Sequence, residues 1–160
     1  MNGPLKLLFG TALIVTPVAC SDSNGKSTAD FCTVAKSLVT SQEGLDVMFE
    51  VTEVPNAADV EAAFGTLIGL VNQLADAAPS DIADDMVVVV RGFTALDSAM
   101  KSAGYDLEVL FTDPAIAAAA AADMAVFSTP ETEAAMDTVD QYSLAECGFS
   151  LDTSGSGLGS

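Results

Sequence analysis

The stretch SDIADDMVVVVRGFTALDSAMKSAG, residues 80–104, carries the clearest structural pattern in the chain. Its apolar side chains recur at alternating intervals of four and three residues, a spacing that places them on one face of an α-helix. The positions are Ile82, Met86, Val89, Phe93, Leu96, Met100 and Ala103. Ser80 can cap the start of this helix, and Gly104 is suited to end it. The pattern predicts a long helix that is buried along this face.

Residues 56–78 repeat the same kind of pattern immediately upstream. The apolar positions are Val60, Phe64, Leu67, Val71, Leu74 and Ala78. Asn56 can cap the start of this helix, and only Pro79 and Ser80 separate its end from the next helix. Such a short connection predicts a tight antiparallel helical hairpin.

Two further helices are expected near the ends of the domain. Residues 30–41 form the first, and beyond Gly44 the chain either continues this helix or makes a separate turn. Residues 129–147 form the last, because Thr129 can cap a helix that has Pro130 at its first position. These two helices therefore mark the two ends of the expected helical domain.

A helix rich in alanine is expected at residues 113–128. Asp113 and Pro114 open it, and residues 117–122 are consecutive alanines. Alanine favours the helix strongly but buries little area. The segment is therefore either a close-packed crossing or a peripheral helix, and the preceding residues 105–111 are expected to be irregular or a single turn.

The N-terminal segment has the layout of an export signal, assigned here to residues 1–19. Lys6 precedes an apolar run, LLFGTALIV at residues 7–15. This run is shorter than the roughly 20 residues that a membrane-spanning helix needs. Residues 20–29 are mostly small and polar, which predicts a flexible tether, and residues 152–160 predict a disordered tail.

The ending Val18-Ala19-Cys20 resembles the lipobox of bacterial lipoproteins. In that family the signal is cut before the cysteine, and the cysteine sulfur carries a diacylglycerol. The resemblance implies a lipid on Cys20, export, and anchoring to the outer face of the bacterial cytoplasmic membrane. Pro17 stands where the family usually has an aliphatic residue. A secreted soluble protein and an uncleaved segment therefore remain alternatives.

Three cysteines, Cys20, Cys32 and Cys147, leave an odd count in an exported chain. If Cys20 carries lipid, the other two are free to pair in an oxidising compartment. Two free thiols and a redox pair are the alternatives, although no C-x-x-C spacing supports the latter.

The direction of the helices gives the expected architecture. Helices that begin near residues 30, 57 and 80 run up, down and up when their connections are short. The last helix must then run down for Cys147 to reach Cys32. We therefore expect an all-α fold over residues 30–151. It is a four-helix up-down bundle with a short, transverse or kinked Ala-rich accessory helix, and a disulfide joins its N- and C-terminal helices.

Several motifs together resemble a group of small helical lipoproteins of actinobacteria. They are the lipobox-like start, the polar tether, Asp30-Phe31-Cys32 at a helix start, AAPSDIADD at residues 77–85, and Glu146-Cys147-Gly148 near the end. The resemblance spans residues 1 to about 151. It implies a cell-envelope location and a Cys32–Cys147 bond, and it brings no catalytic residues.

Charge and composition exclude several kinds of chemistry. The 160 residues contain 23 Asp and Glu, 5 Lys and Arg, and no His, for a formal charge of −18. A chain without histidine has no Ser-His-Asp triad and no His-ligated metal, and its negative charge repels nucleic acid and anionic lipid headgroups.

Paired carboxylates are the remaining candidates for chemistry. The pairs are Asp84 with Asp85, Glu131 with Glu133, and Asp137 with Asp140. Each pair lies where a helix start or a solvated helix face calls for acids, so we predict no catalytic residue, metal ligand or cofactor. The sequence favours a non-enzymatic exported lipoprotein that binds an unknown protein or small ligand or has a structural role. The alternative is a divalent-cation-binding protein or an enzyme that uses carboxylates alone.

Overall fold

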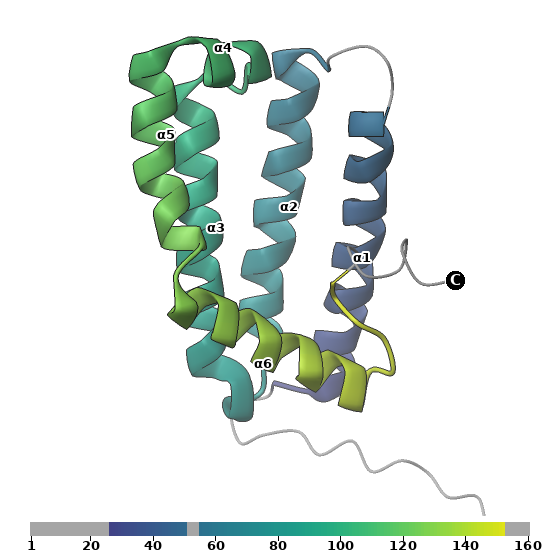
Figure 1. Ribbon diagram of the computed structural model, residues 1–160. Coiled ribbons are helices and arrows are strands. Elements are labelled where there is room, and N and C mark those ends of the chain that lie inside the picture. The colour runs from purple at the N-terminus through teal and green to yellow at the C-terminus, as the bar shows by residue number, and fades with distance from the viewer. Residues whose placement is uncertain (1–25, 51–54, 153–160) are drawn as a thin grey trace, which may run out of the picture.

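The computed structural model describes residues 26–50 and 55–152, and for residues 43–50 it describes the backbone alone. The predicted signal peptide, Cys20, most of the tether and nearly all of the tail lie outside these residues. Within them the chain is all-α, as predicted (Figure 1). The helices are α1 Thr28–Glu50, α2 Ala57–Ala77, the 3-10 turn η1 Ser80–Ile82, α3 Ala83–Ser102, α4 Leu107–Thr112, α5 Pro114–Phe127 and α6 Pro130–Glu146. None of these helices combines the length and the apolar character that a membrane crossing requires.

The hairpin of α2 and α3 forms as the sequence predicts. The side chain of Asn56 accepts a hydrogen bond of 3.1 Å from the backbone N–H of Asp59, which caps α2. The start of α3 differs from the expected Ser80-capped helix, because the chain leaves Pro79 through the 3-10 turn η1. The predicted apolar stripes of both helices are buried or half-buried.

Two shorter predictions are also settled by the structure. The backbone of α1 runs through Gly44 without a break, so the chain continues the first helix rather than making a separate turn. Residues 105–111, expected to be irregular or a single turn, contain most of the six-residue helix α4, which Asp106 caps by accepting from two backbone N–H groups.

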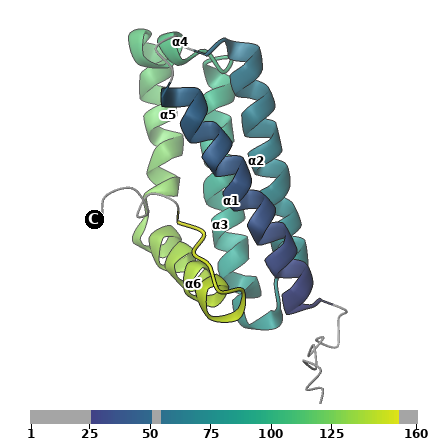
Figure 2. The same ribbon diagram turned by 90° about the vertical axis from the view of Figure 1, so that its right-hand side faces the viewer.

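The structure does not confirm the predicted up-down arrangement and corrects the roles of the last two helices. The Ala-rich α5 is a helix of 14 residues that lies alongside α3, rather than a short transverse piece (Figure 1). The final helix α6 crosses the base of the molecule instead of running down it as the fourth bundle helix (Figures 1 and 2). The helix that runs down after α3 is therefore α5, and α6 then returns the chain to the start of α1.

Small side chains explain why α5 can take this place. Ala120 on α5 and Ala99 on α3 are both almost completely buried. Because alanine extends little from the helix axis, the two backbones can approach closely without a bulky apolar stripe. The turn at Thr129, whose side chain accepts from the N–H of Thr132, then redirects the chain into α6.

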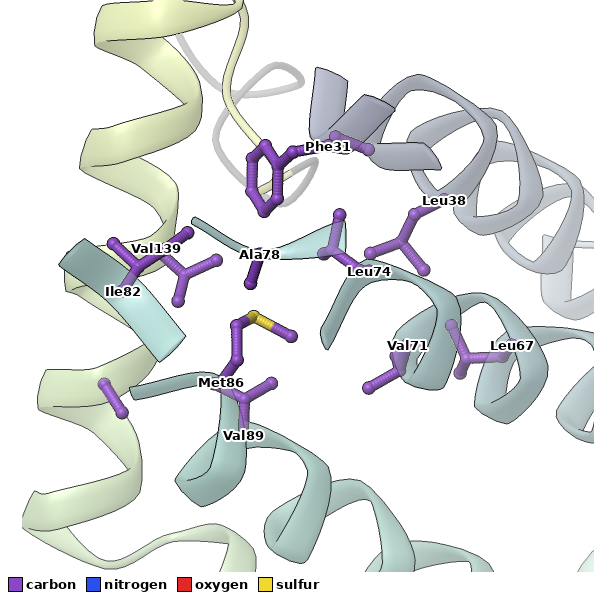
Figure 3. Close-up of a cluster of buried hydrophobic side chains, with 12 residues drawn as sticks. Phe31, Leu38, Leu67, Val71, Leu74, Ala78, Ile82, Met86, Val89 and Val139 are labelled. Carbon is purple, nitrogen blue, oxygen red and sulfur yellow. The ribbon is translucent and has the colours of Figure 1, made fainter. Parts of the chain in front are cut away.

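The buried side chains form two clusters at opposite ends of the molecule. The larger one joins α1, α2, α3 and α6, and Figure 3 shows Phe31, Leu74 and Met86 converging on its centre. The smaller one includes Val60 and Met100 and lies near α4, at the upper end in Figure 1. The larger cluster adjoins the cavity that is described below.

Substitution of a closely packed glycine and of an open helical glycine should change the free energy of unfolding in opposite directions. A Cβ at Gly92 would lie 3.0 Å from the Thr132 methyl carbon and 3.5 Å from the Phe127 ring, whereas a Cβ at Gly69 meets nothing within 4 Å. Gly92→Val should therefore lower the free energy of unfolding by ~1–3 kcal/mol through overpacking. Gly69→Ala should raise it by ~0.5–1 kcal/mol through helix propensity. Urea unfolding measures both, and a Gly92→Val protein as stable as wild type would contradict the close packing of α6 on α3.

Candidate functional site

A disulfide joins the first and last helices, as predicted. The bond connects Cys32 of α1 with Cys147, the residue after α6, and their Cα atoms lie 5.4 Å apart. Beside it, the rings of Phe31 and Tyr142 meet edge to face at 5.3 Å between centroids. The Tyr142 hydroxyl also lies 3.1 Å from the Thr28 hydroxyl. These contacts fix the end of α6 against the start of α1.

A cavity of about 420 Å³ lies where α6 crosses the other helices, and it is the candidate binding site. Its size falls within the range of pockets that hold small molecules, roughly 300–1,000 Å³. Four helices and the segment after α6 contribute its main walls, with one residue from the end of α5. The lining residues are Leu38, Gln42, Val71, Leu74, Val89, Phe93, Phe127, Glu133, Met136, Asp137, Val139, Asp140, Leu151 and Asp152.

The wall of the cavity is mainly apolar, and its polar groups are almost all acids. Glu133, Asp137, Asp140 and Asp152 line it, and no lysine or arginine does. Glu133 and Asp137 are exposed to solvent, so they lie at the mouth rather than on the floor. Gln42 is the remaining polar residue, and its Oε1 atom is buried with no hydrogen-bond partner.

Asp140 has a structural task at the edge of this cavity. Its Oδ1 atom accepts hydrogen bonds from the hydroxyl of Ser150 at 2.7 Å and from the backbone N–H of Leu151 at 2.6 Å. The buried hydroxyl of Ser143 donates to the carbonyl oxygen of Phe149 at 2.8 Å. Together these bonds hold the segment after α6 against the helix, so that Leu151 forms part of the cavity wall.

The other carboxylates considered from the sequence lie apart from the cavity. Asp84 and Asp85 occupy the first turn of α3, where they face the positive end of its dipole. Glu131 forms an exposed ion pair of 3.1 Å with Arg91. Among the described residues, no group of three or more Asp, Glu, His or Cys is placed to hold a metal ion.

A second polar cluster lies at the far end of α3. The Tyr105 hydroxyl donates to Asp97 at 2.8 Å, and Lys101 donates to the other oxygen of the same carboxylate at 2.6 Å. Tyr105 is 7% exposed and follows Gly104 in the left-handed backbone region, with φ of 57° and 62° respectively. The cluster anchors a tight helix end and lines no described cavity.

This cluster makes stability depend on pH at both extremes. Burial, together with the hydrogen bond to Asp97 and its charge, raises the pKa of Tyr105 from 10.0 to about 12. Burial of Asp97 acts to raise its own pKa, but the hydrogen bonds from Lys101 and Tyr105 outweigh it and lower the pKa below 3.8. Asp97 therefore stabilises the fold above pH 3.8, and this contribution is lost as the pH falls through its lowered pKa.

Tyr105→Phe should remove the alkaline part of this dependence. The folded pKa of Tyr105 is raised, so its contribution is complete below pH 10 and is lost as the pH rises to about 12. Wild-type stability should fall by roughly 2–3 kcal/mol more than that of Tyr105→Phe across this window. Urea unfolding of both proteins between pH 8 and pH 12 measures the difference, and parallel curves would show that Tyr105 titrates normally.

Asp137 and Asp140, which the sequence presents as a carboxylate pair, both line the cavity, and Asp140 also holds the segment after α6 through its hydrogen bonds. Gln42, Leu38 and Phe127 were not anticipated, because nothing in the local sequence marks residues that meet only in the folded chain.

Searches of protein-family models, curated proteins and solved structures found no match to the chain.

Proposed function

We propose that the protein is a non-enzymatic, exported bacterial envelope lipoprotein whose helical domain binds a small ligand in the cavity beneath α6. Cys20 carries the lipid and holds the domain at the outer face of the cytoplasmic membrane. The resemblance to small helical lipoproteins of actinobacteria supports the same location.

The observation that carries this proposal is the Cys32–Cys147 disulfide. Disulfides persist in oxidising compartments and are rare in the cytosol, so the bond favours an exported chain. It also occupies two of the three cysteines, which leaves Cys20 for another use. Cys20 stands at the end of a segment with export-signal layout, where a lipid attachment fits its position.

The described polar groups support a binding role over catalysis. Acids at helix starts serve the helix dipoles, and Asp140 holds the segment that follows α6. The cavity offers an apolar wall with a few polar groups, the usual composition of a site that holds a ligand.

Cell fractionation tests the location. In a bacterium that exports and acylates lipoproteins, wild-type protein should sediment with the membranes. Cys20→Ala should instead be found in the soluble fraction or as an uncut precursor. Cys147→Ala is the matched control, because it also removes one cysteine but should stay with the membranes. Wild-type protein recovered in the soluble fraction would overturn the anchor.

A further inference from the structure

We propose that the cavity beneath α6 takes a cationic amphiphile, a molecule with an apolar chain or ring and a protonated amine head. This inference rests on the proposed binding function and adds the chemical class of the ligand. The apolar group of this ligand is inferred from the apolar wall of the cavity, and its cationic head is inferred from the acidic mouth.

The apolar half fits a hydrocarbon group. Val71, Leu74 and Val89 line the cavity and are each no more than 6% exposed, so the inner wall offers no charge to an entering group. Phe93 and Met136 extend this wall and are half-buried. Filling this space removes apolar surface from water on both partners, which favours binding at about 25 cal/mol per Å².

The polar half fits a cation. Glu133 and Asp137 lie four residues apart on α6, so they are neighbours on one face of that helix. Both line the cavity, and no basic side chain does. A positive head at the mouth would be attracted to these carboxylates, whereas a sulfate or carboxylate head would be repelled. The formal charge of −18 for the whole chain acts in the same direction at longer range.

Gln42 also lines the cavity, but its Oε1 atom is enclosed by protein, so the choice of a cation follows from the carboxylates at the mouth.

Calorimetric titration with three probes of equal chain length tests the proposal. The probes are octylammonium, 1-octanol and octyl sulfate, each added to the oxidised protein below its micelle concentration. We expect octylammonium to bind about tenfold more tightly than 1-octanol, because each of two exposed charge contacts contributes only modestly to affinity. Octyl sulfate should bind most weakly. Added salt should reduce the preference for the cation.

Two variants locate the effect. Glu133→Gln/Asp137→Asn should weaken octylammonium binding about tenfold and leave 1-octanol unchanged. Glu61→Gln/Glu146→Gln changes the net charge equally at exposed acids that do not line the cavity, and it should bind octylammonium like wild type. Met136→Trp places a larger side chain in the cavity and should abolish binding of all three probes. A thermal melt with an unchanged transition confirms that this variant is folded.

The outcomes separate the two proposals. Equal binding of the three probes would leave a binding module and overturn the cationic ligand. Equal weakening by the control pair would also overturn it, because the effect would then be one of net charge. No binding of any probe to folded protein would overturn the cavity as a ligand site, while the membrane location is decided independently by fractionation of Cys20→Ala.

Discussion

Removing the bond between Cys32 and Cys147 is expected to lower the free energy of unfolding by about 4–5 kcal/mol. The two cysteines are 115 residues apart in the sequence, so the bond closes a loop that includes nearly the whole described domain. A long closed loop restricts the unfolded chain strongly, and the stabilisation in the chain-entropy model grows with the logarithm of loop length. For a domain of this size the corresponding loss in Tm is roughly 15 °C.

The Cys32→Ala/Cys147→Ala double variant measures this loss by urea unfolding and thermal melts. Reduced wild-type protein should behave like the double variant, because both lack the bond. Cys20→Ala serves as a control for removal of a cysteine and should leave unfolding unchanged. A double variant as stable as the oxidised wild type would contradict the role of the bond in holding α1 to the end of α6.

Phe31→Ala should be the second most damaging change, with an expected loss of ~3–5 kcal/mol. Phe31 is 0% exposed, belongs to the larger core cluster and meets the ring of Tyr142 edge to face. Truncation removes the transfer energy of the ring and leaves a cavity that the α1–α6 contact cannot easily close. The loss should be visible as a lower urea midpoint with little change in slope.

Val87→Ala is the matched control for this prediction. Val87 is 68% exposed on α3, so its truncation removes few contacts and should change stability by less than ~0.5 kcal/mol. Phe31 is next to Cys32 in sequence, so the ring and the bond are expected to couple. If Phe31→Ala and Val87→Ala were equally mild, the α1–α6 packing would be wrong.

The local structure could be predicted from the sequence because its causes are local. The stripe from Ile82 to Ala103, the cap at Asn56 and the Thr129-Pro130 start each need only neighbouring residues, and all appear in the structure. The hairpin of α2 and α3 follows from a connection too short to allow another path. The Cys32–Cys147 pairing was one of the arrangements that the count of three cysteines left open, and the structure contains it.

The arrangement of α5 and α6 could not be predicted in the same way. Alanines at residues 117–122 have no apolar stripe, so the sequence does not show which neighbour the helix packs against. The expectation that the last helix runs down was wrong, because α5 takes the descending place and α6 crosses the base (Figure 1). Gly92, which leaves room for Thr132, is the local feature that permits this crossing.

The cavity could not be predicted from the sequence either. Its walls come from residues as far apart in sequence as Leu38 and Leu151, and no motif links them. Asp140 looks like one more solvated acid, although it accepts backbone N–H groups that only the folded chain brings near. The sequence shows Glu133 and Asp137 only as members of two carboxylate pairs, and it does not indicate that they share the mouth of one cavity.

Intact mass spectrometry of the mature protein from the membrane fraction, before and after reduction, tests the lipid anchor and the disulfide in one experiment. We expect a chain that begins at Cys20, carries a diacylglycerol, and gains two hydrogen atoms on reduction of the Cys32–Cys147 bond. A chain that begins elsewhere without lipid, or one whose mass does not change on reduction, would contradict it.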